Sequence, residues 1–285
     1  MPLIWHNGNL FSPQDIKFNL YDHGLLYGDG VFEGIRQYHG RVFRKQAHLE
    51  RLFDSARAIR LAIPYTHEQV DAAIEATLAA NKFTDCYIRL VATRGINDLG
   101  ISPADATSAS VFIIADKIQM YPAVVYASGM PIITASTIRS HPNMLSPRIK
   151  SLNYLNNINA KWEAIDAGVR EAVMLNHLGF VCECTADNIF IVRQGRLLTP
   201  GEDAGILAGI TRGAVLELAR AAGIPVAEIN LTRFDLYAAE ECFITGTGAE
   251  IVPVTKIDNR PIGKGTPGPM TAQLTAAFHQ LTREG

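Results

Sequence analysis

Residues 146–163 decide how this chain is organised, and their sequence is SPRIKSLNYLNNINAKWE. Pro147 cannot continue a helix that precedes it, so a new element is expected to begin just after it. From there on, apolar side chains recur at helical spacing, at Leu152, Leu155, Ile158, Trp162 and Ile165. This pattern predicts an amphipathic helix whose apolar stripe packs inward.

Lys150 lies at the start of this predicted helix, and Tyr154 follows it by one turn. Side chains at positions i and i+4 of a helix project from the same face, so these two are expected to face the same site. A lysine in a partly apolar pocket loses proton affinity and becomes an amine nucleophile. The alternative is a solvated surface lysine, which the local pattern alone favours. Lys150 is nevertheless a candidate catalytic residue, because the helix after it is rich in asparagine and poor in charge.

Composition and charge exclude several classes of protein. Of the 285 residues, 48% are hydrophobic and 19% are charged, which is typical of a globular enzyme of one large or two modest domains. The formal net charge is −2, without a basic stripe, so neither nucleic acid nor a membrane surface is expected as a partner. Residues 1–5 do not resemble a signal peptide, and no apolar run is long enough to cross a bilayer. We expect a cytoplasmic protein.

The four cysteines do not form a metal-binding pattern. They are Cys86, Cys182, Cys184 and Cys242. Cys182 and Cys184 would share one face of a strand, but this pair lacks the second pair of a zinc site. We therefore expect buried, reduced thiols and no metal.

The first part of the chain alternates short strands, tight turns and two helices. Asn7-Gly8 and His39-Gly40 are hairpin signals between apolar stretches. Helices are predicted over 46–60 and 66–81, the second of which begins with a capping box from Thr66 to Gln69. Strands rich in Ile, Val and Phe are predicted over 87–93 and 110–115. We expect residues 1–118 to form a small α+β domain.

The pattern lapses over residues 119–129, which we predict to be an interdomain linker. Residues 130–285 would then form a larger mixed α/β domain that carries Lys150. Its other predicted strands and helices lie at 188–192, 196–198, 211–222, 226–229, 241–245, 251–257 and from about 269 onward.

Two glycine-containing loops of the large domain suit an anion. Residues 205–211 lead directly into a helix, whose free backbone N–H groups and positive dipole end would hold a phosphate. Residues 245–249 follow a strand, and their glycines allow the backbone to approach a ligand closely. Each loop alone is more simply a turn, but two of them with a candidate amine nucleophile favour a phosphorylated cofactor. Residues 28–34 are not a Rossmann fingerprint, because the residues after them are strand-like.

Glu183 lies within an apolar strand pair. If its side chain points inward, it needs a cationic partner or a proton donor, because a bare buried carboxylate is costly. A protonated pyridine nitrogen would be such a partner. The alternative is a glutamate that faces the solvent.

These segments together resemble the class IV, pyridoxal-phosphate-dependent aminotransferases, and most closely the branched-chain amino acid aminotransferases. The resemblance covers essentially the whole chain. It rests on segments 27–36, 89–90, 93–95 and 150–157, on Glu183 with 187–190, and on 209–212 and 246–250. It implies fold type IV, in which the large domain is a pseudo-barrel, and a homo-oligomer that is a dimer or larger.

The resemblance also implies roles for individual residues toward pyridoxal 5'-phosphate. Lys150 would form the Schiff base and shuttle the proton, and Tyr154 would hydrogen-bond the phenolic oxygen of the cofactor. Glu183 would pair with the pyridine N–H and keep the ring able to accept carbanion charge. The residues implied to bind the phosphate are Arg51, Ile210, Thr211 and Thr247.

Substrate residues are implied in the same way. Tyr87 and Arg89 match a carboxylate-recognising Tyr-Ile-Arg, and alternate strand positions would put them on one face. Tyr27 and Phe32 would line the side-chain pocket, and the backbone amides of Gly248 and Ala249 would contact the α-carboxylate. Cys184 places more bulk beside the glutamate than family members usually carry, which bears on substrate range.

The activity implied is transamination between a branched-chain L-amino acid (Leu, Ile or Val) and 2-oxoglutarate, giving a 2-oxo acid and L-glutamate, as in branched-chain amino acid biosynthesis. The alternatives on the same fold are a D-amino acid transaminase, an (R)-amine transaminase and an aminodeoxychorismate lyase. D-amino acid enzymes typically carry an Arg-x-His carboxylate trap after Thr-Arg-Gly, whereas residues 93–100 here read TRGINDLG. A protein that kept the fold but lost catalysis is a further alternative, although no cofactor residue is missing.

Overall fold

A computed structural model describes residues 1–106 and 109–284 of the chain. It divides into two compact units, Met1–Ile118 with Ile149–Asn153, and Gln119–Arg148 with Tyr154–Gly285. Two features differ from the organisation expected from the sequence. The segment predicted to be a linker, 119–129, belongs to the second unit and contains helix α4 (Ala123–Ser128). Lys150 belongs to the first unit, because its neighbours pair with a strand of that unit.

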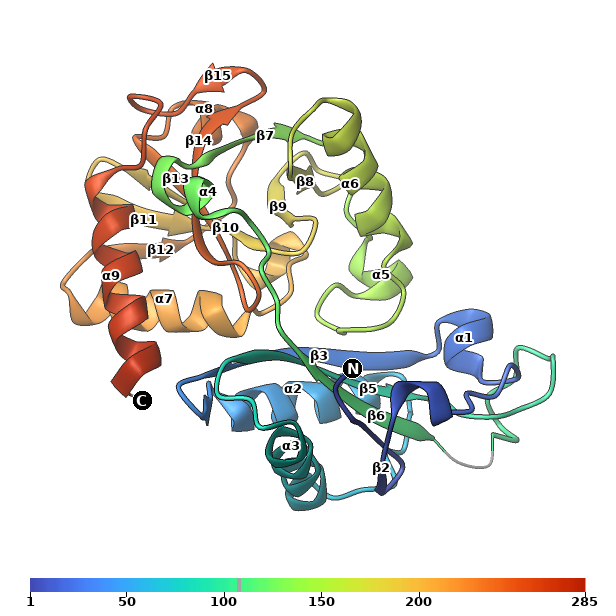
Figure 1. Cartoon of the computed structure of the whole chain (residues 1–285). Coiled ribbons are helices and arrows are strands. Elements are labelled where there is room, and N and C mark those ends of the chain that lie inside the picture. Colours follow the sequence, from blue (N-terminus) through green and yellow to red (C-terminus); the bar gives the residue numbers. More distant parts are fainter. Residues whose placement is uncertain (107–108, 285) are drawn as a thin grey trace. The chain divides into compact units, whose positions relative to one another are not determined.

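The first unit is a six-stranded antiparallel sheet in the order β2-β1-β6-β5-β3-β4, with helices packed against it (Figure 1). Its strands are β1 (Ile4–His6), β2 (Asn9–Phe11), β3 (Gly30–Tyr38), β4 (Arg41–Val42), β5 (Cys86–Thr93) and β6 (Ser110–Asp116). Its helices are η1 (Pro13–Asp15), α1 (His23–Tyr27), α2 (Lys45–Ala58) and α3 (His67–Asn81). Both predicted hairpins are confirmed, and Asn7 and Gly8 have the positive φ angles, 44° and 96°, that a tight hairpin turn requires.

Alternation along β3 and β5 separates the two faces of this sheet. Val31, Ile35, Ile88 and Leu90 are fully buried against the apolar stripes of α2 and α3. The capping box predicted at Thr66 is present at the start of α3. Because the helices cover one face, the intervening residues of β3 and β5 are presented on the other.

The segment around Lys150 is not helical, and Ser151 forms an isolated antiparallel bridge with Val31, so the prediction that it opens a helix was wrong. The N–H of Phe32 donates to the carbonyl of Lys150 over 2.9 Å, and the N–H of Leu152 donates to the carbonyl of Gly30 over 2.9 Å. These backbone groups extend the sheet along β3, so they are not available for helical bonds. Helix α6 (Leu155–Asp166) begins later, with Tyr154 at its N-cap. The predicted i, i+4 relation between Lys150 and Tyr154 was therefore wrong too.

Helix α6 packs through its small side chains rather than its large ones. Asn157, Ala160 and Ala164 are its buried residues, and the two alanines lie against Ala172 and Met174. The side chains predicted to pack inward are about half or more exposed, at Leu155, Ile158, Trp162 and Ile165. Alanines let a helix approach a sheet closely, and here this preference outweighs burial of the larger stripe.

The second unit is built on a nine-stranded mixed sheet in the order β12-β11-β10-β13-β14-β7-β8-β9, with β15 paired to β14. Its strands are β7 (Met130–Thr134), β8 (Ala172–Leu175), β9 (Val181–Cys184), β10 (Asn188–Arg193), β11 (Arg196–Thr199), β12 (Val226–Glu228), β13 (Glu241–Gly246), β14 (Glu250–Ile257) and β15 (Arg260–Pro261). The sheet curls into a half-barrel, as the resemblance implied (Figure 1).

Helices lie around this sheet, and a continuous apolar core fills it. The helices not yet named are α5 (Pro142–Leu145), η2 (Glu202–Ala204), α7 (Ile210–Ala221), α8 (Arg233–Tyr237) and α9 (Pro269–Glu284). The core includes Ile189, Ile191, Ile244, Val252 and Val254. Cys182, Cys184 and Cys242 are buried and free, as is Cys86 in the first unit, which confirms the predicted reduced thiols. Within the described residues, no helix is both long and apolar enough to span a membrane.

Candidate active site

The backbone of Lys150 is held from two sides within the first unit. Its carbonyl accepts from Phe32 of β3, and its N–H donates to the hydroxyl of Ser55 of α2 over 3.2 Å. The side-chain Nζ lies 4.6 Å from the centre of the Phe32 ring. The backbone of Lys150 is therefore fixed by these two bonds, and its amine lies beside an aromatic surface, which is the partly apolar setting that the sequence predicted.

Arg89 and Tyr87 lie on the same face as Phe32. The guanidinium carbon of Arg89 is 4.5 Å from the centre of the Phe32 ring, and Arg89 Nη2 donates to the Tyr87 hydroxyl over 3.1 Å. A Cβ on Gly34 would meet that hydroxyl at 1.9 Å, so the tyrosine lies directly over this glycine and would have to shift for any other residue. The structure thus brings together Lys150, Phe32, Tyr87 and Arg89.

Tyr27 and Arg94 make contacts of other kinds. The hydroxyl of Tyr27 donates to the carbonyl of Leu99, and its ring packs edge-on against His23. Arg94 forms a bidentate ion pair with Asp29, at 2.8 and 2.9 Å, and donates to two backbone carbonyls at the end of α2. Arg94 therefore fastens a loop, and its guanidinium is engaged by these partners.

Arg51 is held by the buried Glu33 of β3. Nε and Nη2 of Arg51 donate to the two carboxylate oxygens over 2.7 and 2.8 Å, and Nδ1 of His48 lies 2.7 Å from the same group. Burial raises the pKa of Glu33, but Arg51 and His48 outweigh it and bring that pKa to about 2. Burial also lowers the pKa of His48, which Glu33 offsets only in part. The orientation of the Arg51 guanidinium is thereby fixed.

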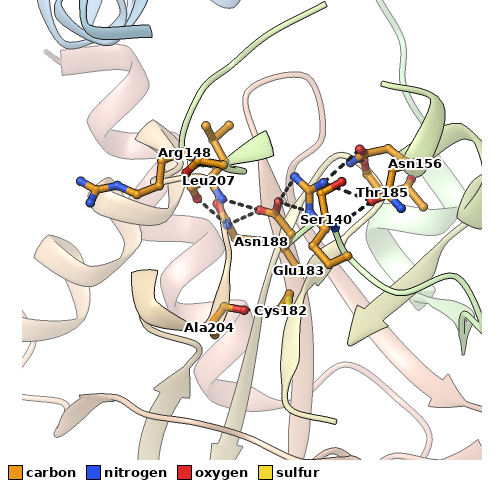
Figure 2. Close-up of polar contacts among 12 residues, drawn as sticks. Ser140, Arg148, Asn156, Cys182, Glu183, Thr185, Asn188, Ala204 and Leu207 are labelled. Atoms are coloured by element: carbon orange, nitrogen blue, oxygen red, sulfur yellow. Dashed lines mark hydrogen bonds and ion pairs between the residues drawn. The ribbon is translucent and has the colours of Figure 1, made fainter. Parts of the chain in front are cut away.

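Glu183 is the centre of a hydrogen-bond network in the second unit (Figure 2). Arg139 donates from Nε and Nη2 to one carboxylate oxygen, over 3.0 and 2.8 Å. The Asn188 side chain and the N–H of Leu207 donate to the other oxygen, over 3.1 and 3.0 Å. The side chains of Arg139 and Glu183 are only 9% and 7% exposed. Glu183 points inward and has a cationic partner, as one of the two sequence interpretations required.

The two predicted anion loops meet the same network. Gly209 is the N-cap of α7, and Ile210 and Thr211 are the first two residues of that helix. A Cβ on Gly209 would lie 2.0 Å from Asn188 Oδ1, so the loop passes tightly against the asparagine that holds Glu183. Asn188 also pairs with Thr245 across β10 and β13.

The second loop is the turn between β13 and β14, which contains Thr247, Gly248 and Ala249. A Cβ on Gly246 would lie 2.0 Å from Asp187 Oδ1, and the buried hydroxyl of Thr245 makes no hydrogen bond within the part of the chain described. A helix N-terminus, two tight glycine positions and an unpartnered hydroxyl fit a phosphate, and Glu183 fits a protonated ring nitrogen. Within the described residues, no cluster of three or more His, Cys, Asp or Glu could hold a metal ion.

Sequence reasoning missed three residues of this network. Arg139 lies in the irregular segment between β7 and α5, where no periodic pattern marks it. Asn157 donates to the carbonyl of Thr185 over 2.7 Å, and its oxygen accepts from Arg139 over 3.2 Å. Asn188 opens an apolar strand, and a polar residue in that position is the signal that could have found it.

The second unit combines a helix N-terminus, which suits a phosphate, with the buried carboxylate of Glu183, which suits a protonated ring nitrogen. Together they suit a phosphorylated cofactor that contains a nitrogen ring. The chain belongs more narrowly to the class IV aminotransferases. Residues 30–257 match the family model described as amino-transferase class IV.

Curated relatives resemble the chain along almost its whole length. It is 48% identical over 278 residues to a putative branched-chain-amino-acid aminotransferase of Methanocaldococcus jannaschii, covering 98% of this chain and 96% of the relative. It is 38% identical over 285 residues to the branched-chain-amino-acid aminotransferase of Pseudomonas aeruginosa, covering 98% and 92%.

A solved structure shares the fold closely. The branched-chain amino acid aminotransferase of Escherichia coli superimposes with a TM-score of 0.96 at 35% identity, covering 99% of this chain and 94% of that one. This match confirms the fold type IV architecture that the resemblance implied. The branched-chain amino acid aminotransferase of Thermobaculum terrenum, in its pyridoxal-phosphate form, gives a TM-score of 0.91 at 32% identity, covering 98% and 93%.

Proposed function

We propose that this chain is a pyridoxal-phosphate-dependent aminotransferase that exchanges an amino group between branched-chain L-amino acids and 2-oxoglutarate. The observation that carries the proposal is the group formed by the Lys150 amine, the Phe32 ring and the Arg89 guanidinium. It combines a nucleophile, an apolar surface and a cation on one face of one sheet. The names of the relatives described above support the same substrate class.

Each unit contributes residues with a proposed role toward pyridoxal phosphate. Pyridoxal phosphate supplies an electrophilic carbon and a ring that accepts electrons. Lys150 would bond to that carbon through its amine and would carry the proton to and from the substrate Cα. Glu183 would accept a hydrogen bond from the ring N–H, and Tyr154 would donate one to the phenolic oxygen. Phosphate binding falls to Arg51, the backbone N–H groups of Ile210 and Thr211, and Thr247.

The substrate side has to admit two unlike side chains. Phe32 and Tyr27 offer apolar surface to a leucine-like side chain, and Arg89 pairs with the distal carboxylate of glutamate. The α-carboxylate is assigned to the backbone amides of Gly248 and Ala249. Tyr87 steadies Arg89 through the hydrogen bond between them.

The test carries out the two half-reactions of transamination one after the other. Purified protein reconstituted with pyridoxal phosphate should turn yellow, and L-leucine should then bleach the colour and yield the corresponding 2-oxo acid. Adding 2-oxoglutarate should restore the colour and yield L-glutamate. Preference for D-amino acids or (R)-amines, or release of pyruvate from aminodeoxychorismate without a keto acid, would replace the proposal with one of its alternatives. A protein that stays colourless would end it.

We further propose a cytoplasmic homodimer or larger homo-oligomer. The apolar side chains of α6 support this, because Trp162 and Ile165 are 58% and 50% exposed in the single chain. Apolar surface of this kind is typical of an interface between subunits. Sedimentation velocity of the holoenzyme should give at least a dimer, and an active monomer at micromolar concentration would contradict the proposal.

A further inference from the structure

Arg139 brings a positive charge to the group of donors that hold Glu183. Its backbone is fastened by a hydrogen bond from its N–H to the carbonyl of Leu175, over 2.9 Å. Its Nη1 is held by the oxygen of Asn157, over 3.2 Å. The guanidinium is therefore fixed on its far side while Nε and Nη2 face the carboxylate.

The bonds from Arg139, Asn188 and Leu207 are divided unequally between the two oxygens of Glu183. One oxygen takes both bonds from the guanidinium, and the other takes bonds from two neutral groups, the amide of Asn188 and the N–H of Leu207. A carboxylate in such a setting is favoured in its ionised form, because protonation would leave a buried guanidinium without a counter-charge.

A buried carboxylate beside a pyridine nitrogen can share a proton in two ways. The proton stays on the nitrogen, leaving an ion pair, or moves to the carboxylate, leaving two neutral groups. Removal from water favours the neutral arrangement, because neither buried charge then has to be solvated. A third charge fixed behind the carboxylate reverses this preference, since the carboxylate then has to compensate the guanidinium.

Resting on the proposed function, in which Glu183 meets the ring nitrogen of pyridoxal phosphate, we propose that Arg139 is a positioning residue. It keeps Glu183 ionised and so keeps the ring nitrogen of the cofactor protonated. The ring is a stronger electron acceptor in that state.

Two other ionisable groups lie near Glu183 in the sequence or in space, Cys182 and Arg148, and neither changes the balance of charge between Arg139 and Glu183. The thiol of Cys182 precedes Glu183 and donates to the carbonyl of Ala204. Burial, with Glu183 adding to it, raises the pKa of Cys182 to about 12, so that thiol is uncharged at neutral pH. The Arg148 guanidinium pairs with Glu202 instead, and both of those side chains are largely exposed.

The experiment follows the ring nitrogen directly. Holoenzyme is reconstituted with pyridoxal phosphate labelled with ¹⁵N in the ring, and the ¹⁵N resonance distinguishes a pyridinium from a neutral pyridine. Wild type should show the pyridinium at neutral pH. Arg139→Gln, which can still donate to Glu183 but has no charge, should move the resonance toward that of a neutral pyridine at the same pH, because the proton then shifts to the carboxylate. Arg139→Met should behave in the same way.

The control and the rescue separate charge from structure. Lys161→Met removes a different cation from a buried carboxylate, since Lys161 Nζ lies 2.8 Å from Glu171, and it should leave the ring resonance unchanged. Arg139→Lys keeps the charge but not the bidentate geometry, so its ring ¹⁵N resonance should lie between those of wild type and Arg139→Gln. If Arg139→Gln and Arg139→Met do not fold, the comparison of Arg139→Lys with wild type decides whether Arg139 sets the protonation of the ring nitrogen.

The outcomes distinguish this inference from the function beneath it. A pyridinium resonance that is the same at neutral pH in wild type, Arg139→Gln and Arg139→Lys would overturn the role of Arg139 while leaving the aminotransferase proposal intact. A neutral pyridine in wild type itself would overturn both the role of Arg139 and the assignment of Glu183 to the ring.

Discussion

Phe32 and Lys150 are joined twice, by a backbone hydrogen bond of 2.9 Å and by the Lys150 amine lying 4.6 Å from the Phe32 ring. The strand that carries the apolar wall of the proposed substrate pocket therefore also sets the position of the nucleophile. The backbone at Lys150 is held on its carbonyl side by pairing with β3 and on its N–H side by Ser55, which restricts the position from which the side chain starts.

Replacement of Lys150 tests the nucleophile. Lys150→Ala should abolish the visible absorption of the cofactor-bound protein and lower amino transfer by several orders of magnitude, because the amine that bonds to the cofactor is gone. The backbone pairing that places residue 150 does not involve its side chain, so the circular dichroism spectrum and melting temperature should change little. Lys161→Ala serves as the control and should keep both colour and activity.

The Glu33 cluster predicts a specific loss of stability in acid. The pKa of Glu33 is held at about 2, below its ordinary value of 4.5, so the folded state binds the proton more weakly than the unfolded state. The resulting stabilisation, about 3 kcal/mol, is present above pH 4.5 and is lost as the pH falls toward 2. Denaturant unfolding as a function of pH should show this loss in wild type.

Glu33→Gln should remove that part of the acid dependence. At pH 7 it should also destabilise the protein by about 3–5 kcal/mol, since Arg51 loses its buried counter-charge. If the free energy of unfolding fell equally with pH in wild type and in Glu33→Gln, the Glu33 cluster would not be the cause of the acid destabilisation.

Much of the fold follows from local signals in the sequence. The Asn7-Gly8 turn, the Thr66 capping box and the strands at 87–93 and 110–115 depend on neighbouring residues, and the structure confirms each of them. The buried thiols follow in the same way from the apolar strands around them.

The errors arise where distant parts of the chain compete for the same groups. Helical spacing from Leu152 onward is real, but pairing of residues 150–152 with β3 delays the helix to Leu155. Its large stripe is exposed because the alanines opposite pack more closely against the sheet. Arg139 could not be predicted, because its importance comes entirely from a glutamate 44 positions away.

Two glycines of the loop and helix at 209–213 form a matched pair for testing the phosphate cup. A methyl group on Gly209 would lie 2.0 Å from Asn188 Oδ1, whereas one on Gly213 meets nothing within 4 Å. Gly209→Ala should weaken binding of pyridoxal phosphate by about tenfold or more, because it displaces Asn188 and the first turn of α7. Gly213→Ala should leave affinity unchanged and stabilise the protein by up to about 1 kcal/mol. Equal affinities of the two variants for pyridoxal phosphate, measured by equilibrium titration, would show that this loop does not hold the cofactor.

Arg89 should separate the two substrates of the proposed reaction. The distal carboxylate of glutamate would be desolvated in a pocket lined by Phe32, and a guanidinium compensates it. Leucine needs no such partner. Arg89→Ala should therefore lower kcat/KM for glutamate and 2-oxoglutarate by about 10²-fold or more, as for a lost charged pair of about 3 kcal/mol, and lower that for leucine by less than about tenfold.

The control for this experiment is Arg94→Ala. Arg94 is committed to Asp29 and two backbone carbonyls, so its loss should lower the melting temperature and leave the ratio of the two substrates unchanged. Equal losses for glutamate and leucine in Arg89→Ala would assign Arg89 to the α-carboxylate or to the structure. An unchanged glutamate reaction would mean that another residue receives the distal carboxylate, and the geometry of Tyr87 over Gly34 would then serve packing alone.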